Sequence, residues 1–222
     1  MPTEDYTVLS RSVLNDFEGG KTVEGFTYES KTPSSALETF EWDNVWYEHT
    51  EDVEAKRFLY IGDSISVGTR GWITVLSDRK ILCDGFATSK ALDNPFFKPL
   101  LEIFMAQEKR IDGILINNGL HGWHLSSSEY ENGYRDMLEF LAAKGKPVYA
   151  LLTTMLPAEI KRDGIVCERN KIASSVADKL GIPVIDLYSV TKEHTEYYSA
   201  DNVHLVEDGY KLLARRILDA IE

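Results

Sequence analysis

Apolar residues recur along the chain in short runs, and their spacing gives the first indication of the fold. From residue 57 onward, runs rich in aliphatic and aromatic side chains alternate with polar intervals that are each long enough to hold a helix. Such alternation is typical of parallel strands joined by crossover helices. We therefore expect an α/β domain with a five-stranded parallel sheet and helices on both faces. The predicted strands cover residues 58–61, 81–86, 111–116, 148–153 and 184–187.

Three of the intervals show apolar positions at the three- and four-residue spacing of a helix. The last of these helices is predicted over about residues 207–221, and the one before it ends at Gly181, since glycine favours a helix end. The stripes comprise, in turn, Tyr130/Tyr134/Met137/Leu138/Leu141, Ile172/Val176/Leu180 and Leu213/Ile217/Ile221.

Residues 1–55 differ from the rest of the chain because their aromatic side chains stand among Glu, Thr and Ser. The stretches at 23–28 and 39–47 predict short extended segments with one buried face. We expect an aromatic-rich N-terminal extension, residues 1–55, that packs on a main domain of residues 56–222. These aromatic side chains offer stacking surfaces for a sugar, although burial in a core is their more common role.

The composition is that of an ordinary globular protein, with 43% apolar and 27% charged residues. The 36 acidic residues outnumber the 24 Lys and Arg residues, so the formal net charge is −12. A negative charge of this size repels phosphate backbones and anionic lipids, so neither nucleic acid nor a membrane is an expected partner. Neither a basic leader nor an apolar run of about eighteen residues is visible, which predicts a cytoplasmic protein.

The first candidate for chemistry follows the strand predicted at residues 58–61. This apolar run stops at the Gly-Asp-Ser of residues 62–64, and catalytic groups in open α/β sheets collect just beyond the carboxyl ends of strands. Ser64 therefore stands where a nucleophile is expected. The alternative is that Ser64 is the N-cap of the next helix, which is a frequent role of serine.

The second candidate lies before the last helix, where Asp201 and His204 are three residues apart. A serine nucleophile needs a base that takes its proton, and the base needs a carboxylate that fixes its tautomer. Taken alone, the pair is more typical of a loop in which an aspartate caps a turn. Together with Ser64, in the chain order Ser, Asp, His, it predicts a catalytic triad.

With these blocks in place, the sequence resembles the SGNH hydrolases, which are also called GDSL esterases and lipases. Residues 62–64 match the nucleophile block of that family, and the Asp-Asn-Val-His of residues 201–204 matches its Asp-x-x-His block. Gly85 matches the block whose glycine contributes a backbone N–H to the oxyanion hole. The resemblance covers about residues 57–222 and implies a three-layer, flavodoxin-like α/β/α fold with a serine esterase activity.

One block departs from the family pattern. SGNH hydrolases usually carry Gly-x-Asn-Asp after the third strand, with the asparagine side chain as an oxyanion donor, whereas this chain reads Asn-Gly-Leu-His-Gly at residues 118–122. The alignment puts His121 at the asparagine position, and a neutral imidazole has one N–H that can donate to an oxyanion. The resemblance thus implies an oxyanion hole of Ser64, Gly85 and His121. Asn118 is the rival donor, and a purely structural His121 is a further alternative.

The Asn-Gly-Leu-His-Gly form resembles a branch of the family that we associate with acyl or acetyl esters, carbohydrate esters among them. The expected function is that of a serine esterase that hydrolyses small acyl esters through an acyl-enzyme, with a small-molecule or carbohydrate ester as substrate. A thioesterase or lysophospholipase with the same triad is one alternative. A catalytically weak relative that binds an acylated glycan is the other.

Four further residues are candidates for substrate contact. Trp123 and His124 would line the acyl or alcohol pocket, and Arg70 and Lys90 would meet an acidic or hydroxylated substrate. For each of the four, a surface or packing role is an equal alternative. No nucleotide cofactor is expected, because no glycine-rich phosphate-binding motif is present. A metal site is not expected either, because the histidines lack a cysteine or carboxylate at a supporting spacing.

Overall fold

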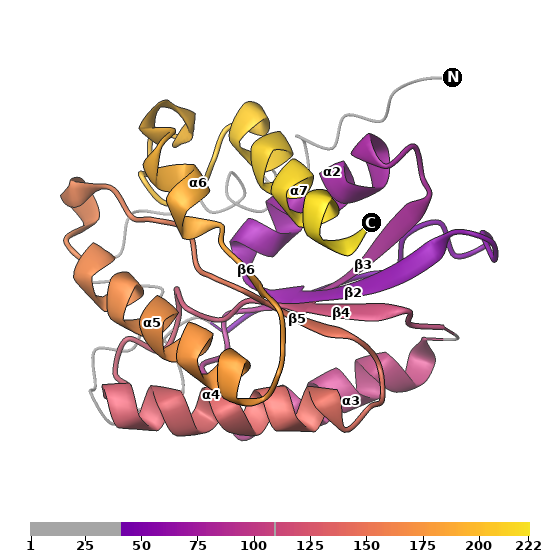
Figure 1. Cartoon of the computed structure of the whole chain (residues 1–222), viewed down its shortest axis with the longest axis horizontal. Helices are drawn as coiled ribbons and strands as arrows, with labels where there is room; N and C mark the ends of the chain where they lie inside the picture. Colours follow the sequence, from indigo (N-terminus) through magenta and orange to yellow (C-terminus); the bar gives the residue numbers. More distant parts are fainter. Residues whose placement is uncertain (1–40, 109) are drawn as a thin grey trace, which may run out of the picture.

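A twisted sheet runs through the middle of the molecule, with helices on either side (Figure 1). The computed structural model describes residues 41–108 and 110–222. In this part of the chain the sheet has six strands, in the spatial order β1-β3-β2-β4-β5-β6. The strands are β1 (Asp43–Trp46), β2 (Lys56–Gly62), β3 (Ile81–Thr88), β4 (Gly113–Ile116), β5 (Val148–Leu151) and β6 (Val184–Ile185).

The five strands predicted from the apolar runs are all present, and they pair with one another in parallel. Their order, β3-β2-β4-β5-β6, is the flavodoxin-like arrangement that the resemblance implied. The strand count needs one correction, because β1 adds a sixth, antiparallel strand at the outer edge of β3. This strand lies within the extended segment predicted at 39–47, but three of its four residues are exposed, so it lacks the buried face that was predicted for the segment.

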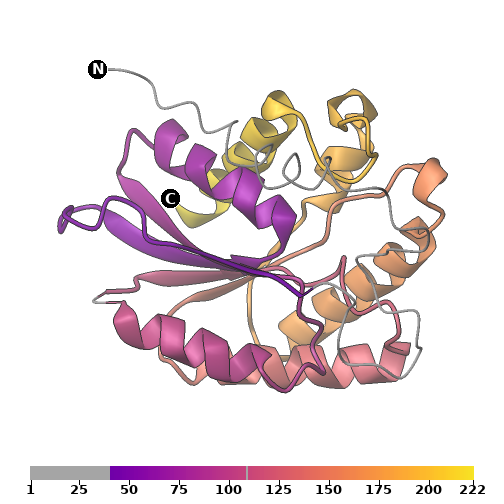
Figure 2. The ribbon, with the colours of Figure 1, turned by 180° about the vertical axis from the view of Figure 1, so that it is seen from behind.

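Two helical layers cover the faces of the sheet, as the views from opposite sides show (Figures 1 and 2). Helices α2 (Ser64–Leu76) and α7 (Glu207–Ile221) pack together on one face, next to the short α6 (Tyr188–Lys192). The opposite face carries α3 (Phe97–Gln107), α4 (Ser127–Ala142) and α5 (Asp163–Lys179). The result is the three-layer α/β/α arrangement expected from the sequence.

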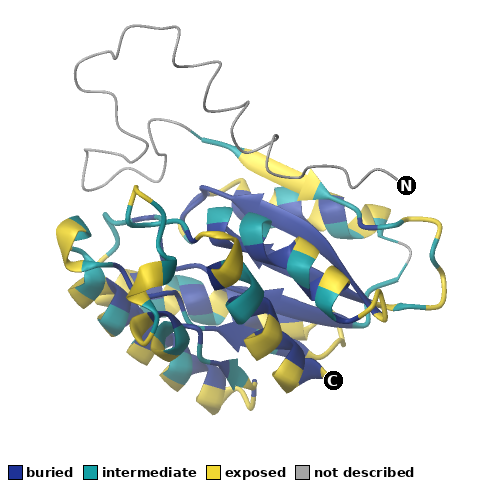
Figure 3. Ribbon diagram, turned by 90° about the horizontal axis from the view of Figure 1, so that it is seen from above, coloured by how far each residue is buried: buried dark blue, intermediate teal, exposed yellow. Residues whose placement is uncertain are grey.

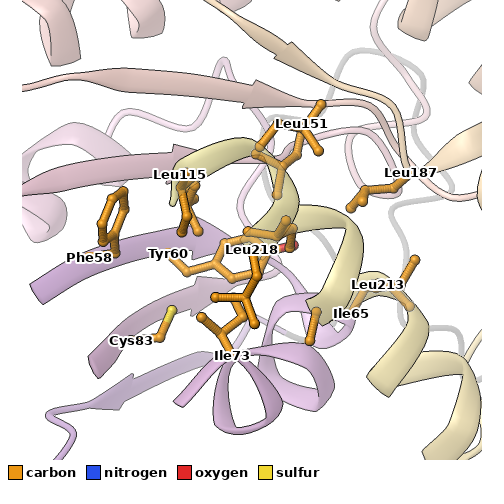
Figure 4. Close-up of a cluster of buried hydrophobic side chains, with 14 of the residues drawn as sticks. Phe58, Tyr60, Ile65, Ile73, Cys83, Leu115, Leu151, Leu187, Leu213 and Leu218 are labelled. Atoms are coloured by element: carbon orange, nitrogen blue, oxygen red, sulfur yellow. The ribbon is translucent and has the colours of Figure 1, made fainter. Parts of the chain in front are cut away.

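Side chains of β2 alternate between the two layers, because successive residues of a strand point to opposite faces. Phe58 and Tyr60 join the apolar cluster under α2 and α7 (Figure 4), whereas Leu59 and Ile61 join the cluster under the other three helices. Both faces of the strand are therefore buried, as the dark central strands of Figure 3 show. A strand buried on both faces reads as a continuous apolar run, which is why this one could be found from the sequence.

Two of the three helical stripes are confirmed. All five predicted residues of α4 are buried, and α7 covers the predicted range with its three predicted residues inside. The stripe predicted for α5 is wrong in part, because Leu180 is exposed and Ile172 is only partly buried. The inward face of α5 instead comprises Val166, Arg169, Asn170, Ala173, Val176 and Ala177.

The described part of the N-terminal extension packs on the core through β1. The register pairs Asp43 with Thr88 and Trp46 with Gly85, so these four residues continue the sheet. The extended segment predicted at 23–28 lies outside the described residues. Among the helices that the structure describes, none combines the length and the apolar character needed to cross a membrane.

Candidate active site

Ser64 is the first residue of α2, immediately after the carboxyl end of β2. The N-cap of this helix is Asp63 rather than Ser64, because the Asp63 carboxylate accepts a hydrogen bond of 2.9 Å from the N–H of Ile65. The Ser64 hydroxyl is thus not occupied with capping the helix. Its own N–H lies at the helix start, where backbone donors have no acceptor within the helix.

His204 lies in the loop that leads into α7, and Asp201 organises this loop. One carboxylate oxygen of Asp201 accepts hydrogen bonds from the N–H groups of Val203 and His204, both at 2.9 Å, and from the Ser199 hydroxyl at 2.7 Å. The second oxygen lies 2.6 Å from Nδ1 of His204. The local sequence therefore holds the carboxylate and the imidazole in one fixed arrangement.

The loop brings His204 to Ser64, 140 positions earlier in the chain. Nε2 of His204 lies 2.7 Å from Oγ of Ser64, within hydrogen-bonding distance. With Nδ1 turned toward the Asp201 carboxylate, the tautomer that bears its proton on Nδ1 leaves Nε2 free to accept the serine proton. The His204 side chain is 40% exposed, so a substrate can approach the pair from solvent.

The two aspartates of this region have pKa values shifted in opposite directions. Burial raises the pKa of Asp201, but hydrogen bonds from His204, Val203 and Ser199 outweigh burial, and the pKa lies below the usual value. Asp201 is therefore a carboxylate at neutral pH. Burial raises the pKa of Asp63, and this effect is opposed by the nearby imidazoles of His121 and His204. Both imidazoles therefore favour the charged form of the buried Asp63 carboxyl.

The predicted oxyanion donors on the loop after β4 differ in their surroundings. His121 is partly buried, and its imidazole lowers the pKa of Asp63. Asn118 is buried, and its Nδ2 donates to the Lys90 carbonyl at 3.2 Å. The Oδ1 of Asn118 is buried with no hydrogen-bond partner among the residues that the structure describes, and an oxygen cannot donate to an oxyanion.

Gly85 does not occupy the position that the resemblance implied. It lies inside β3 and pairs with Tyr60, two residues before β2 ends at Gly62. Its backbone therefore belongs to the interior of the sheet and not to the edge from which Ser64 projects. The missing side chain has a packing reason, since a Cβ at Gly85 would lie 2.2 Å from Nη1 of Arg70. The register and this packing therefore give no support to Gly85 as an oxyanion donor.

Arg70 and Lys90, which were predicted to contact the substrate, are both buried. Their side chains bind residues of the N-terminal segment. Arg70 stands six residues after Ser64, about 9 Å along the helix axis. Its Nη2 donates to Asn44 at 2.8 Å. Nζ of Lys90 lies 2.8 Å from the Asp43 carboxylate. Both side chains fasten residues 43–44 to the core.

Trp123 and His124 follow the same loop as His121 but are held by other partners. Nε2 of His124 lies 2.8 Å from the Asp93 carboxylate, and its side chain is only 7% exposed. The indole of Trp123 lies within 4.9 Å of the guanidinium groups of Arg162 and Arg169. These contacts account for both residues by packing.

Trp42 is a neighbour of the site that the motifs did not single out. Its ring meets the His121 imidazole nearly edge to face, with centroids 6.1 Å apart. The backbone of Trp42 is fixed by Ser89, whose N–H donates to the Trp42 carbonyl at 3.1 Å and whose hydroxyl accepts from the Trp42 N–H at 2.9 Å. The only indication in the sequence that an aromatic residue would lie near the site was the abundance of such residues in the N-terminal extension.

No group of three or more His, Cys, Asp or Glu side chains is arranged to hold a metal ion within residues 41–108 and 110–222. The chemistry at Ser64 can be described with the side chains named above.

Comparison with known proteins places the chain by its fold. No protein-family model matches the sequence, and no curated protein sequence is significantly similar to it. Solved structures, by contrast, show that the chain has the fold of the SGNH or GDSL hydrolases, which confirms at the level of the fold the class that the motifs resemble.

Three of these solved structures illustrate the likeness. An acetylxylan esterase from Geobacillus stearothermophilus is 16% identical, with a TM-score of 0.60 over 76% of this chain and 94% of the esterase. A lipolytic G-D-S-L protein from Veillonella parvula is 23% identical, with a TM-score of 0.58 over 74% and 97%. The catalytic domain of peptidoglycan O-acetyltransferase A from Streptococcus pneumoniae is 21% identical, with a TM-score of 0.58 over 75% and 93%.

Proposed function

We propose that this protein is a serine esterase that hydrolyses small acyl esters, with acetyl esters of carbohydrates as the favoured substrate class. The observation that carries the proposal is the 2.7 Å separation between Oγ of Ser64 and Nε2 of His204. A serine hydroxyl becomes a nucleophile when a neighbouring base accepts its proton, and here the base is itself oriented by the Asp201 carboxylate at 2.6 Å.

The reaction begins when Oγ of Ser64 attacks the ester carbonyl carbon and His204 takes the hydroxyl proton at Nε2. The tetrahedral intermediate collapses, the C–O bond to the alcohol breaks, and the alcohol leaves with the proton from His204. An acyl-enzyme on Ser64 remains. His204 then deprotonates a water molecule that attacks the acyl carbon, and the carboxylic acid leaves as Ser64 regains its proton.

The negative charge on the intermediate needs donors that are already in place. The N–H of Ser64 at the start of α2 is one such donor, and the helix dipole favours an anion there. The side chain of His121 is the second donor in our proposal, supported by its place on the loop after β4, its ring contact with Trp42 and its electrostatic effect on Asp63. Asn118 is the less favoured donor, because its Nδ2 already donates to Lys90.

The substrate class rests on two observations. The acetylxylan esterase among the structural neighbours shares the fold, which is compatible with acetyl chemistry. Trp42 presents a partly exposed indole beside His121, and aromatic faces suit the apolar faces of sugar rings. A small acyl group on a sugar hydroxyl therefore fits both the reaction and the surroundings.

Replacement of Ser64 by alanine tests the proposal directly. Ser64→Ala is expected to abolish the hydrolysis of p-nitrophenyl acetate and the labelling by a fluorophosphonate, with an unchanged circular dichroism spectrum. Ser66→Ala is the matched control, since Ser66 lies in the same turn and its hydroxyl donates to the Asp63 carbonyl instead. Activity near the wild-type level in Ser64→Ala would refute the proposal.

A series of esters with increasing acyl length separates the proposed function from its alternatives. A small acyl pocket is saturated by acetyl, whereas a thioesterase or lysophospholipase gains binding with each added methylene. Release of a single acyl group without further turnover, combined with tight binding of an acetylated glycan, would identify a weak binding relative instead.

A further inference from the structure

The loop that carries His121 is held by its backbone carbonyl groups. The hydroxyl of Tyr130 in α4 donates to the Asn118 carbonyl at 2.6 Å. Arg169 in α5 donates to three more carbonyls of the same loop, at 3.0 Å to Gly119, 2.7 Å to His121 and 2.6 Å to Gly122. Four of the five carbonyls from 118 to 122 are thus bound by two side chains of the neighbouring helices.

Arg169 is buried, so its charged guanidinium has lost its hydration, which is unfavourable in free energy. Its side chain is only 2% exposed, and its guanidinium lies 4.9 Å from the ring centroids of both Trp123 and Tyr130. A buried guanidinium needs hydrogen-bond acceptors in a fixed geometry, and its planar fork of donors suits several carbonyls at once. The three carbonyls and the two rings therefore define a single position for the group.

The shape of the loop follows from these hydrogen bonds. Carbonyl and N–H point in opposite directions across a planar trans peptide, so each carbonyl bound by Arg169 turns the next N–H away from α5. Gly122 has φ of +68°, which allows the carbonyls of residues 121 and 122 to reach one guanidinium. A Cβ at Gly122 would also lie 2.5 Å from that of Ala91.

We infer that Arg169 is a positioning residue for the oxyanion donor: it binds the carbonyls of His121 and of the glycines on either side of the loop turn, and so fixes the backbone from which the imidazole projects. Tyr130 assists by holding the start of the same loop. This inference rests on the proposed function, because it concerns the geometry of that reaction. Arg169 acts through His121 and does not contact the substrate.

The inference predicts a particular kinetic pattern. Preorganised donors lose much of their effect when they are displaced by about 1 Å, and such a displacement can cost about 100-fold in rate. Arg169→Gln should therefore lower kcat about 100-fold and leave KM within about twofold. Arg169→Lys, which keeps the charge but not the fork of donors, should restore only part of the rate.

A double-mutant cycle tests whether the effect passes through His121. In a His121→Ala background, Arg169→Gln should lower kcat by less than about threefold, because the donor to be positioned is already absent. Lys171→Gln is the matched control, since Lys171 is an exposed cation on the same helix. A further loss of about 100-fold in the His121→Ala background would overturn the inference.

Amide hydrogen exchange provides a readout that does not depend on catalysis. Arg169→Gln should raise exchange in residues 117–125 and leave β2 and α7 unchanged. If Arg169→Gln unfolds the protein, Tyr130→Phe removes a single hydrogen bond of the same loop and should raise exchange there with a smaller loss of kcat. Unchanged loop exchange in the folded variants would overturn the inference. A wild-type protein without esterase activity would refute the proposed function, and hydrogen exchange would still decide whether Arg169 holds the loop.

Discussion

The indole of Trp42 meets the imidazole of His121 at an interplanar angle of 74°. Trp42 comes from the N-terminal segment before β1, whereas His121 follows β4 in the centre of the sheet. The contact is possible because β1 adds to the outer edge of β3 and carries the preceding residues toward the carboxyl ends of the strands. The N-terminal segment thus borders the candidate active site.

This contact predicts a role for Trp42 in substrate choice. Trp42→Ala should raise KM for an acetylated xylo-oligosaccharide up to about tenfold, because an aromatic contact contributes about 0.5–1.5 kcal/mol. KM for p-nitrophenyl acetate should change by less than about twofold, since that ester lacks the sugar. Trp42→Phe keeps a ring and serves as the control. Equal changes in KM for the two esters would show that Trp42 acts only on the fold.

Replacement of His121 distinguishes the two oxyanion donors. His121→Ala should lower kcat about 100- to 1000-fold with little change in KM, the loss expected for one oxyanion donor. His121→Asn should recover part of this rate, because an amide N–H also donates. Asn118→Ala should have the smaller effect on kcat. The opposite order, measured with p-nitrophenyl acetate, would assign the donor to Asn118.

Asp201 should matter through the tautomer of His204. Asp201→Asn leaves the side chain the same size but offers an N–H where His204 needs an acceptor, and such a reversal costs about four orders of magnitude in kcat. Ser199→Ala is the milder control, since it removes only the 2.7 Å hydrogen bond to Asp201. The expected loss is about four orders of magnitude, so a kcat for Asp201→Asn within about tenfold of wild type would argue against the triad.

Glu108 should make the stability of the folded state depend on pH in the alkaline range. Burial and the negative charge of Asp84 raise its pKa from 4.5 to about 8, against the opposing effect of Arg57. The folded state therefore binds this proton more tightly than the unfolded state. The resulting stability is fully present below about pH 4.5 and is lost as the pH rises through about 8.

Glu108→Gln should remove this dependence, because the amide carries no charge at any pH. At pH 9 the variant should melt about 2–4 °C above wild type, as expected for about 1 kcal/mol in a chain of this size. At pH 5 the difference should be smaller. Glu102→Gln, at an exposed position of α3, the helix that ends just before Glu108, is the control and should show no pH-dependent difference. Parallel melting curves for wild type and Glu108→Gln from pH 5 to 9 would contradict the prediction.

The parts of the fold that could be predicted are those in which a local pattern and the tertiary structure agree. β2 is buried on both faces and reads as one apolar run, and the α4 stripe follows the helical period without exception. The triad of Ser64, Asp201 and His204 could be predicted for a similar reason. Ser64 opens α2, and Asp201 and His204 lie in the loop before α7, so each stands where a short polar motif interrupts the apolar pattern.

Other features depend on contacts between distant segments. The sequence predicted an extended segment at 39–47, where β1 lies, but the exposed side chains of β1 gave no sign that its backbone would pair with β3. Gly85 matched a motif by residue type, but its glycine makes room for Arg70. For α5 the sequence predicted an inward stripe of Ile172, Val176 and Leu180, whereas Arg169 also turns inward and binds the carbonyls of the loop after β4.

β1 also determines where the chain can be shortened. The motifs suggest a boundary near residue 56, yet a protein that began there would lose the antiparallel neighbour of β3. The outer peptide groups of residues 85–88, which pair with β1, would then face water without partners. Unpaired sheet edges of this kind can pair with strands of other molecules. We therefore expect the truncated protein to aggregate even though Ser64 and His204 are intact.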